Sequence, residues 1–319
     1  MNGSGLGLLQ RGLRRVHRAL CRTLPSHWIL NYALALPQFW RGNKRLPRRA
    51  DDPTASLNDI IFHRMIRDDW TLLQRACVDK EHAKEIMQAK VPHLKVARTA
   101  AVMTLSNATT PEDVLAFLTP FLGRRLVVKP THSCGVILYL DRPLETQDLR
   151  RFVQFSKRNF FHAARETQYR TLERKLIVEE NIAPPGGLND YKFTCADGHI
   201  LHGRLDVGRF SARHQRALFT VPGFEIIPVS YGGLEIPSAI EQPPHFADMV
   251  DIARRLSRGF DFVRVDLYDT PDGVYFGELT FTPCAGSTSY SDERVPIDLA
   301  CRWKAIMADM QPMATIQPN

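Results

Sequence analysis

The sequence predicts an α+β fold, in which helices alternate with antiparallel strand pairs. Apolar strands come in pairs around short turns, as at 261–268 and 274–281 on either side of 270–273. Residues 190–207 and 216–230 resemble a β meander, because their apolar positions alternate and glycines separate them. The helical segments do not follow each strand in turn, so a simple β-α-β-α winding is not indicated.

Composition places the chain among ordinary globular proteins. It has 319 residues, of which 44% are apolar and 24% charged, enough for one large domain or two modest ones. It has no uninterrupted apolar stretch of about 18 residues, which a membrane-spanning helix needs. Six scattered cysteines without a CxxC pair argue against a disulfide scaffold and a structural zinc site, and they fit a reducing cytoplasm.

The net charge of +8 belongs to the N-terminal segment. Residues 1–50 contain ten Lys and Arg and no Asp or Glu, which leaves 32 basic and 34 acidic residues, a net of −2, in 51–319. A basic footprint for nucleic acid over the whole domain is therefore absent, and nucleic acid is not an expected partner.

Residues 6–24 are predicted to form a basic amphipathic helix, because apolar residues recur at helical spacing with arginines between them. Such a helix can lie on an anionic membrane, against a partner or against its own domain, and Arg-rich, acid-poor segments also occur as organellar transit peptides. The arginines interrupt every apolar run up to Arg22, which argues against a secretory signal. The apolar face consists of Leu6, Leu9, Leu13, Val16 and Leu20.

The segment 41–57, rich in charge and containing two prolines, is expected to be an irregular connection. A basic arm and linker at 1–57 therefore precede a main region at 58–319, and the arm is expected to be separable from it. Thr110-Pro111-Glu112-Asp113 is a helix-start signal, with proline in the first turn and acids near the positive helix end. Helices are predicted at 58–76, 79–90, 111–122, 145–158, 163–174, 245–258 and 296–309, and further strands at 97–103, 125–130, 136–140 and 175–180.

The last strand pair carries the strongest candidate site. Alternate side chains of a strand share a face, so Asp266 and Glu278 converge if the strands form a hairpin. Two carboxylates and a hydroxyl suit Mg²⁺ when phosphate supplies its other ligands. On spacing alone, a surface network in which Arg264 neutralises both acids is the more common arrangement. The predicted faces are Arg264, Asp266 and Tyr268 on one strand, and Phe276, Glu278 and Thr280 on the other.

Three weaker signals precede this hairpin. Lys129 ends an apolar strand before the small-residue turn 131–135, where a cation and backbone N–H groups can hold a polyphosphate, although the Walker pattern is absent. Asp79-Lys80 opens a helix, and Glu179-Glu180 ends a strand ahead of Asp190-Tyr191-Lys192. Taken singly, these are also ordinary strand ends and a solvated helix face.

The order of these motifs resembles the ATP-grasp superfamily, over about residues 58–295. The phrases Asp190-Tyr191-Lys192-Phe193 and Gly277-Glu278-Leu279-Thr280 resemble its TupA-like branch, named for teichuronopeptide biosynthesis. The resemblance implies two α+β subdomains that grip ATP between antiparallel sheets. It also implies an N-terminal part at 58–125, an ATP-binding lid at 126–182, and a metal and acceptor subdomain at 183–319.

The resemblance also implies residue roles. Most ATP-grasp enzymes have Asn where this chain has Thr280, whose hydroxyl is a weaker Mg²⁺ ligand. The implied ATP residues are Lys80 and Lys129 for phosphates, Glu179 and Ile182 for adenine, Asp190 or Glu180 for ribose, and Lys192 near the phosphates. The implied chemistry residues are Asp266, Glu278 and Thr280 for Mg²⁺, Arg264 for the developing oxyanion, and Gly286, Ser287 and Arg204 for the acceptor.

The activity that the resemblance implies is ATP- and Mg²⁺-dependent carboxylate–amine ligation through an acyl-phosphate, in the synthesis of a cell-surface polysaccharide or poly-amino-acid polymer. The absence of a Ser/His/Asp or Cys/His motif fits a reaction that needs no side-chain nucleophile. The expected location is cytoplasmic, with peripheral contact to the inner membrane face through residues 1–50. Two alternatives stay open: a kinase of the same fold that phosphorylates a sugar hydroxyl, and a non-catalytic membrane-associated scaffold.

Overall fold

The computed structural model describes residues 3–133, 135–184, 187–209, 211 and 213–310, with the backbone alone for 3–11. By internal contacts the chain forms two compact units that share a boundary after Ile182. The predicted division at residues 57, 125 and 182 stays a prediction. Unit 1 consists of Met1–Leu46, His63–Ala83 and Ala97–Ile182, and unit 2 of Pro47–Phe62, Lys84–Val96 and Ala183–Asn319.

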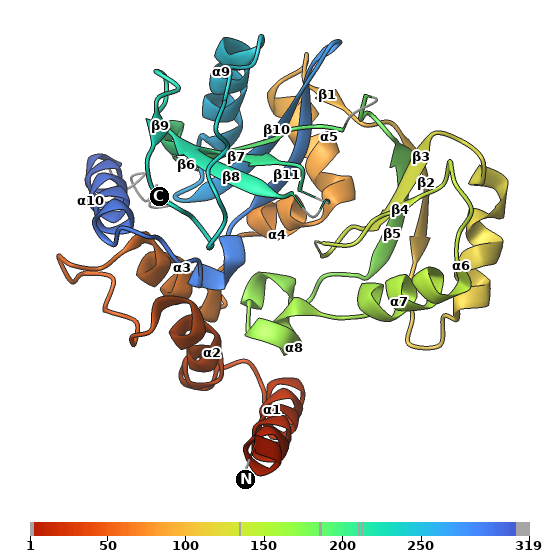
Figure 1. Cartoon of the computed structure of the whole chain (residues 1–319), viewed down its shortest axis with the longest axis horizontal. Helices are drawn as coiled ribbons and strands as arrows, with labels where there is room; N and C mark the ends of the chain where they lie inside the picture. The colour runs from red at the N-terminus through yellow and green to blue at the C-terminus, as the bar shows by residue number, and fades with distance from the viewer. Residues whose placement is uncertain (1–2, 134, 185–186, 210, 212, 311–319) are drawn as a thin grey trace, which may run out of the picture. The chain divides into compact units, whose positions relative to one another are not determined.

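Unit 1 is built on a four-stranded antiparallel sheet with strand order β2-β5-β3-β4 (Figure 1). Val128 and Val178 face each other on neighbouring strands and are buried in one apolar cluster with side chains of α6 and α7. α6 begins at the predicted signal, since Thr110 forms a capping box with Asp113. These elements are β2 Thr99–Thr104, β3 Leu126–Pro130, β4 Leu138–Tyr139, β5 Lys175–Glu180, α6 Pro111–Leu118 and α7 Thr146–Ser156.

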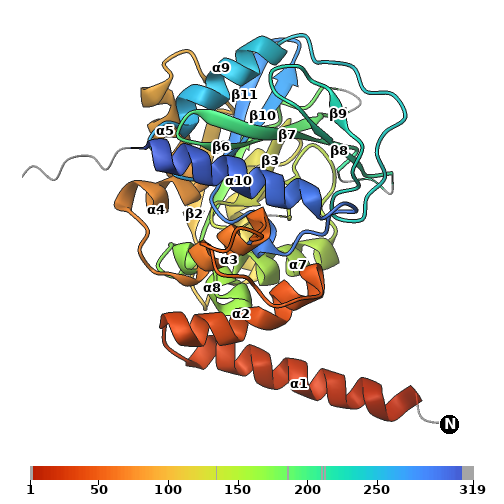
Figure 2. The ribbon, with the colours of Figure 1, turned by 90° about the vertical axis from the view of Figure 1, so that its left-hand side faces the viewer.

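Two helices open unit 1, α1 (Gly3–Thr23) and α2 (Trp28–Asn43), and Figure 2 shows them side by side. α1 confirms the predicted N-terminal helix. α2 is not predicted, because its sequence is apolar on nearly every side and contains Pro37, so no polar face marks the helix. It nevertheless contributes to the core of the unit, since Leu34 and Phe39 are buried. Removal of the N-terminal segment would therefore open that core.

The helix predicted at 58–76 is two helices, α3 (Leu57–Ile66) and α4 (Leu72–Val78). The break is local, because Thr71 starts α4 with a second capping box. The helix predicted at 79–90 is confirmed as α5, Lys80–Lys90.

The helix predicted at 163–174 is wrong. The chain forms a short helix there, α8 (Phe160–Ala164), followed by a 3₁₀ turn at Thr167–Tyr169. Arg165 ends α8 in the left-handed region, with φ of 61°, and its guanidinium is buried.

Unit 2 contains a seven-stranded sheet of order β1-β11-β10-β6-β7-β8-β9, antiparallel except for the β1–β11 pair. Helix α9 packs on β6, β7 and β10, where the Phe246 ring centre lies 6.3 Å from that of Phe193. The meander, the last hairpin and both C-terminal helices are thus confirmed. The elements are β1 Lys95–Val96, β6 Asp190–Ala196, β7 His199–Val207, β8 Gln215–Phe219, β9 Ile226–Ile227, α9 Phe246–Ser257, β10 Val263–Thr270, β11 Gly273–Thr280 and α10 Arg294–Asp309.

A β-bulge at Gly277 corrects one predicted face. Asp266 pairs with Glu278, but Leu267 pairs with Phe276, so Gly277 is passed over. Phe276 therefore lies on the apolar face with Leu267 instead of sharing a face with Glu278. Glycine is required here, because a Cβ would lie 2.9 Å from the ring of Tyr268.

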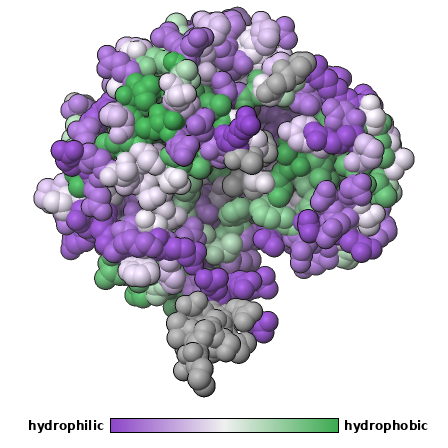
Figure 3. All heavy atoms as spheres, in the orientation of Figure 1, coloured by the Kyte–Doolittle hydropathy of each residue, from purple (hydrophilic) through white to green (hydrophobic). Residues whose placement is uncertain are grey.

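Polar residues cover much of the surface seen in Figure 3, with hydrophobic patches between them, as in most globular proteins. Within the described part of the chain, none of the helices is both long and apolar enough to cross a bilayer.

Candidate active site

A row of charged residues crosses four neighbouring strands of the unit 2 sheet. Glu278 faces Asp266, Asp266 faces Lys192, and Lys192 faces Arg204, each as a direct partner in the strand register. Cross-strand partners share a face, so all four side chains lie on the face opposite α9. All four were expected site residues, Arg204 through the family resemblance alone, and the sheet brings them together.

Asp266 is the centre of this row. It is 1% exposed and accepts from two cations: Lys192 Nζ lies 2.5 Å from its Oδ2, and Arg264 Nε lies 2.6 Å from its Oδ1. The second Arg264 nitrogen donates to Asp266 Oδ2 at 2.8 Å and lies 3.3 Å from Glu278 Oε1. Arg264 does pair with both acids, but the network is buried, unlike the surface network that spacing alone favours.

The charge of Arg264 is secure within this network. Burial is the largest single influence and acts to lower its pKa, but the charge and hydrogen bonds of Asp266, together with the charge of Glu278, raise the pKa well above its ordinary value. The same guanidinium donates to Thr280 Oγ1 at 2.9 Å. The Thr280 hydroxyl therefore already accepts a hydrogen bond from a charged donor. This favours a role in positioning Glu278 and Arg264 over direct ligation of Mg²⁺.

Asp190 lies one row further along the same face. Its Oδ2 is 2.5 Å from Lys192 Nζ and also pairs with Arg209, whereas its buried Oδ1 has no hydrogen-bond partner within the described residues. Tyr268 faces Asp190 across the strand pair, and burial, with the nearby carboxylate, raises the pKa of this phenol well above its usual value. A buried oxygen without a donor can accept a hydrogen bond from water or from a ligand hydroxyl.

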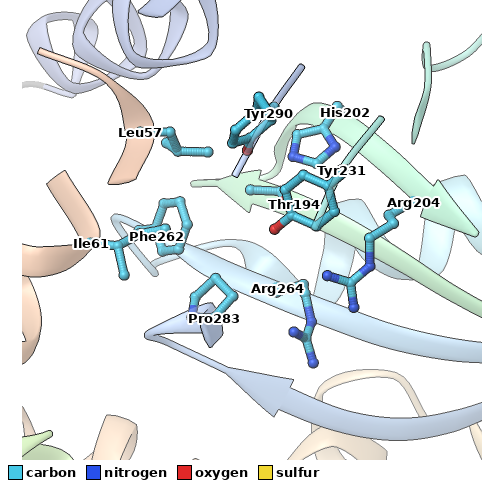
Figure 4. Close-up of a pocket in the computed structure, with 10 residues that line it drawn as sticks. All are labelled: Leu57, Ile61, Thr194, His202, Arg204, Tyr231, Phe262, Arg264, Pro283 and Tyr290. Atoms are coloured by element: carbon cyan, nitrogen blue, oxygen red, sulfur yellow. The ribbon is translucent and has the colours of Figure 1, made fainter. Parts of the chain in front are cut away.

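A small pocket opens on this face of unit 2 (Figure 4). Two guanidinium groups, of Arg204 and Arg264, lie on one side of the view, and apolar side chains lie on the other. The lining contains no Asp or Glu. It is formed by Leu57, Ile61, Thr194, His202, Arg204, Tyr231, Phe262, Arg264, Pro283 and Tyr290.

Arg204 has spare hydrogen-bonding capacity in this pocket. One terminal nitrogen lies 3.1 Å from Asp206 Oδ2, but its buried Nε has no partner within the described residues. Burial acts to raise the pKa of Asp206, yet the charges of Arg204 and Arg216 hold it far below its usual range. The pocket therefore offers an incoming molecule a buried guanidinium N–H donor, and the carboxylates that pair with its two arginines lie outside the lining.

The two predicted acceptor residues after β11, Gly286 and Ser287, are not among the residues that line this pocket. Gly286 has φ of 64°, and a Cβ there would lie 2.5 Å from the Asn58 carbonyl oxygen, so this glycine permits close packing on α3. Ser287 Oγ donates to the Cys284 carbonyl at 2.6 Å.

The remaining predicted residues belong to unit 1. Lys129 Nζ on β3 lies 2.5 Å from Glu179 Oε1 on β5, and the Glu179 side chain is 6% exposed. Lys80 Nζ, at the start of α5, donates to the Ser133 carbonyl at 2.6 Å. Both lysines thus contact oxygen atoms of the protein, and their phosphate-binding role stays a prediction. Glu180 is exposed and Ile182 is half-buried.

Asp79 organises the loop that Lys80 contacts, a role the sequence did not indicate. Its Oδ1 accepts from the Glu81 N–H at 2.9 Å, and its Oδ2 accepts from the Thr131 hydroxyl at 2.9 Å. Burial and the charge of Lys80 lower the pKa of His132 to about 4, so this imidazole is neutral. Cys134 lies outside the described residues.

Sequence reasoning also missed the polar partners on β6, β7 and β8. Thr194 and His202 face each other beside Arg264, and Asp206 faces both Asp190 and Arg216. Alternate polar residues along 190–194 and 202–206 were the available signal, since that period marks one polar sheet face.

The row fits a divalent ion bound together with phosphate. Among the described residues, no group of three or more His, Cys, Asp and Glu could hold a metal alone. Asp266 and Glu278 offer two facing carboxylates, and Mg²⁺ in nucleotide sites takes one or two carboxylates with the remaining ligands from water and phosphate.

Several solved ATP-grasp structures are similar to this chain at low identity. The ATP-grasp ligase PsnB complexed with minimal precursor, Mg and ADP is 14% identical, with a TM-score of 0.38 over 73% of this chain and 59% of that one. D-alanine–D-alanine ligase from Bacillus anthracis is 16% identical (TM-score 0.34, 72% and 69%), and VanG D-Ala:D-Ser ligase from Enterococcus faecalis is 16% identical (TM-score 0.39, 73% and 61%). The chain thus spans less than two thirds of the length of PsnB.

None of the curated proteins matches the sequence. The family described as TupA-like ATPgrasp, in contrast, matches residues 61–299. This range includes every residue of the site named above except Leu57 and Asn58 of α3. Since that match covers well over half of the chain, the protein belongs to the TupA-like ATP-grasp family.

Proposed function

We propose that the protein is an ATP- and Mg²⁺-dependent carboxylate–amine ligase. The observation that carries the proposal is the row Glu278–Asp266–Lys192–Arg204, flanked by Arg264 and Asp190 on one sheet face. Crowded negative charge is the main obstacle when phosphate meets a carboxylate, and this face supplies both cations and metal ligands against it.

The proposed reaction has two steps. A carboxylate oxygen of one substrate attacks the terminal phosphorus of ATP, which forms an acyl-phosphate and releases ADP. An amine then attacks the acyl carbon and loses a proton, and the C–O bond to phosphate breaks, which yields an amide and inorganic phosphate. In this proposal Arg264 would stabilise the oxyanion and Lys192 would contact phosphate oxygens, and each would leave Asp266 when the ligand binds.

Mg²⁺ would be held by Asp266 and Glu278, and it supplies charge neutralisation of the phosphates when bound. Asp190 Oδ1, the buried oxygen without a partner, would accept from a ribose hydroxyl. In unit 1, Lys80 and Lys129 would bind phosphates, and Glu179 with the backbone near Ile182 would contact adenine. The reaction needs no thiol nucleophile, and burial raises the pKa of Cys195 to about 12, which keeps that thiol protonated.

The pocket favours an acidic substrate. Its lining has two arginines and no acid, and Arg204 Nε is buried with no partner within the described residues. A carboxylate of a uronic acid or of an amino-acid polymer satisfies that donor. We therefore extend the proposal to the synthesis of a cell-surface polysaccharide or poly-amino-acid polymer, in the cytoplasm at the inner membrane face.

Mass spectrometry of products tests the proposal. The protein is incubated with Mg-ATP and pairs from a panel of uronic acids and amino acids. A ligase yields an amide together with ADP and phosphate, whereas a kinase leaves the phosphate on the acceptor. Glu278→Gln should yield no amide, and Glu241→Gln, an exposed acid of the same unit outside the pocket lining, should behave as wild type. Phosphorylated acceptor, or no Mg-ATP-dependent product from any pair, would reject the ligase.

A further inference from the structure

Exposed large apolar side chains are concentrated near the N-terminus. Of the eleven in the described part of the chain, seven lie between Leu13 and Leu46. Apolar residues scattered singly on a surface are ordinary, but so many on two adjacent helices single out this part of the surface for closer inspection.

The outer side of α2 forms the first part of this surface. Ile29, Ala33, Pro37 and Trp40 recur every three or four residues and are all exposed, with 53% for Ile29 and 54% for Trp40. The opposite side of α2 is buried within unit 1, where Phe39 is 0% exposed. α2 is therefore an apolar helix with one buried face and one bare face.

The predicted apolar stripe of α1 forms the second part. Leu13, Val16 and Leu20 are 61%, 59% and 41% exposed, so they do not pack on the rest of the described structure. The side chains of Leu6 and Leu9, which continue the stripe in the sequence, lie outside the described residues.

Both helices are fixed to unit 1 by one buried arginine. Arg165 Nε donates to Asn31 Oδ1 at 2.9 Å, and its terminal nitrogens donate to the carbonyls of Cys21 at 2.9 Å and Pro25 at 2.6 Å. His17 Nε2 lies 2.8 Å from the Leu34 carbonyl, which joins α1 to α2. The bare stripes thus belong to a folded part of the protein and not to a loose tail.

The charge around the stripes identifies what covers them. The ten cations of residues 1–50 are accompanied by no acid, and the α1 arginines Arg14, Arg15, Arg18 and Arg22 are all exposed. Lys44 Nζ lies 5.4 Å from the centre of the Trp40 ring, beside the α2 stripe. Apolar helix faces bordered by cations, with tryptophan at the edge, are typical of helices that lie in the plane of an anionic bilayer.

We infer that the outer faces of α1 and α2 form a docking surface for an anionic lipid bilayer, with Ile29 and Trp40 entering the headgroup region. This inference deepens the membrane location in the proposed function, and it does not depend on the ligase chemistry. The enzyme would then meet its acidic substrate at the membrane surface.

Vesicle co-sedimentation of the full chain tests the inference. The probes are vesicles of phosphatidylcholine with phosphatidylserine, vesicles of phosphatidylcholine alone, and the mixed vesicles at high salt. Wild type should bind the mixed vesicles, and salt should weaken the binding because the Debye length shortens. The double variant Ile29→Gln/Trp40→Gln should bind with an affinity at least roughly tenfold lower, since two apolar side chains no longer enter the bilayer.

The matched control is Leu72→Gln/Leu73→Gln, which changes two exposed leucines of α4, 87% and 48% exposed, outside the docking surface. It should bind as wild type, and melting curves of both double variants should show that each is folded. Equal binding by wild type and Ile29→Gln/Trp40→Gln would overturn the inference. Failure of wild type to bind the vesicles would also overturn it. If wild type then self-associates in sedimentation velocity and Ile29→Gln/Trp40→Gln does not, the surface would be assigned to contact with a second copy of the chain. Ligation of soluble substrates is measured separately, so its absence bears on the proposed function alone.

Discussion

Asp266→Asn and Glu278→Gln should separate the structural and the chemical roles of the two carboxylates. Each substitution keeps the shape of the side chain and removes one negative charge from the proposed Mg²⁺ site. The two acids differ in how tightly they are held in the free protein. Asp266 is buried and accepts three hydrogen bonds from Lys192 and Arg264, at 2.5, 2.6 and 2.8 Å. The Glu278 side chain is 17% exposed, and its oxygen lies 3.3 Å from Arg264 and 3.5 Å from the Thr280 hydroxyl, which are longer contacts.

The magnitudes follow from this difference. Removing one partner of a buried ion pair costs about 3–5 kcal/mol, because the opposite charge is left uncompensated. For a unit of this size each kcal/mol lowers Tm by roughly 2–4 °C, so Asp266→Asn should lower Tm by about 6–20 °C. Long contacts of a partly exposed carboxylate are worth less than about 1 kcal/mol, so Glu278→Gln should melt within about 4 °C of wild type.

Both variants should nevertheless lose Mg-ATP-dependent turnover by about a hundredfold or more. Melting curves without ligand and ADP release with Mg-ATP measure the two effects, with Glu241→Gln as the control. Equal melting temperatures for Asp266→Asn and wild type would show that the buried network is not formed. Full activity in Glu278→Gln would remove it from the metal site.

Three further outcomes are expected. Mg-ATP at about 100 times its Kd should stabilise wild type by roughly 2.7 kcal/mol. Lys129→Ala, which removes the ion pair with Glu179, should reduce that shift in a melting assay, and an undiminished shift would exclude Lys129 from the phosphate site. Burial lowers the pKa of His202 to about 4, so the folded state binds fewer protons than the unfolded state between pH 6.5 and 4. The contribution of neutral His202 to the free energy of unfolding should be fully present above about pH 6.5 and should fall by about 2 kcal/mol by pH 5. In urea titrations at several pH values, His202→Gln should reduce the dependence of the free energy of unfolding on pH. Gly286→Ala should lower Tm, because its Cβ would meet the Asn58 carbonyl at 2.5 Å and φ is positive; an unchanged Tm would show that the loop shifts freely.

Local chemistry is what the sequence could predict. The helix start at Thr110, the apolar strand 175–180 and the alternation around Asp266 depend on neighbours within a few residues, and each is found as expected. The order of the charged motifs added the fold class, because the TupA-like resemblance covers the same region as the family match.

Features that depend on distant partners were out of reach. The pairing of β10 with β6 places Lys192 against Asp266, and the sequence of neither strand predicts which strand it pairs with. Hydrophobic periodicity does not reveal α2, because both of its faces are apolar. Arg165 was expected within a helix, and only the carbonyls of the α1–α2 connection, some 140 residues earlier in the chain, explain why it is buried.

The two-faced sheet of unit 2 has a consequence for how this family can change in evolution. An insertion or deletion of one residue inside β6 or β10 would turn every following side chain over, sending Lys192 or Asp266 toward α9 and apolar residues toward the charged row. Such changes are tolerated only in pairs, or where a glycine bulge such as Gly277 absorbs the odd residue. Length variation among relatives should therefore collect in the turns between the strands, and odd length differences within β11 should coincide with the gain or loss of that glycine.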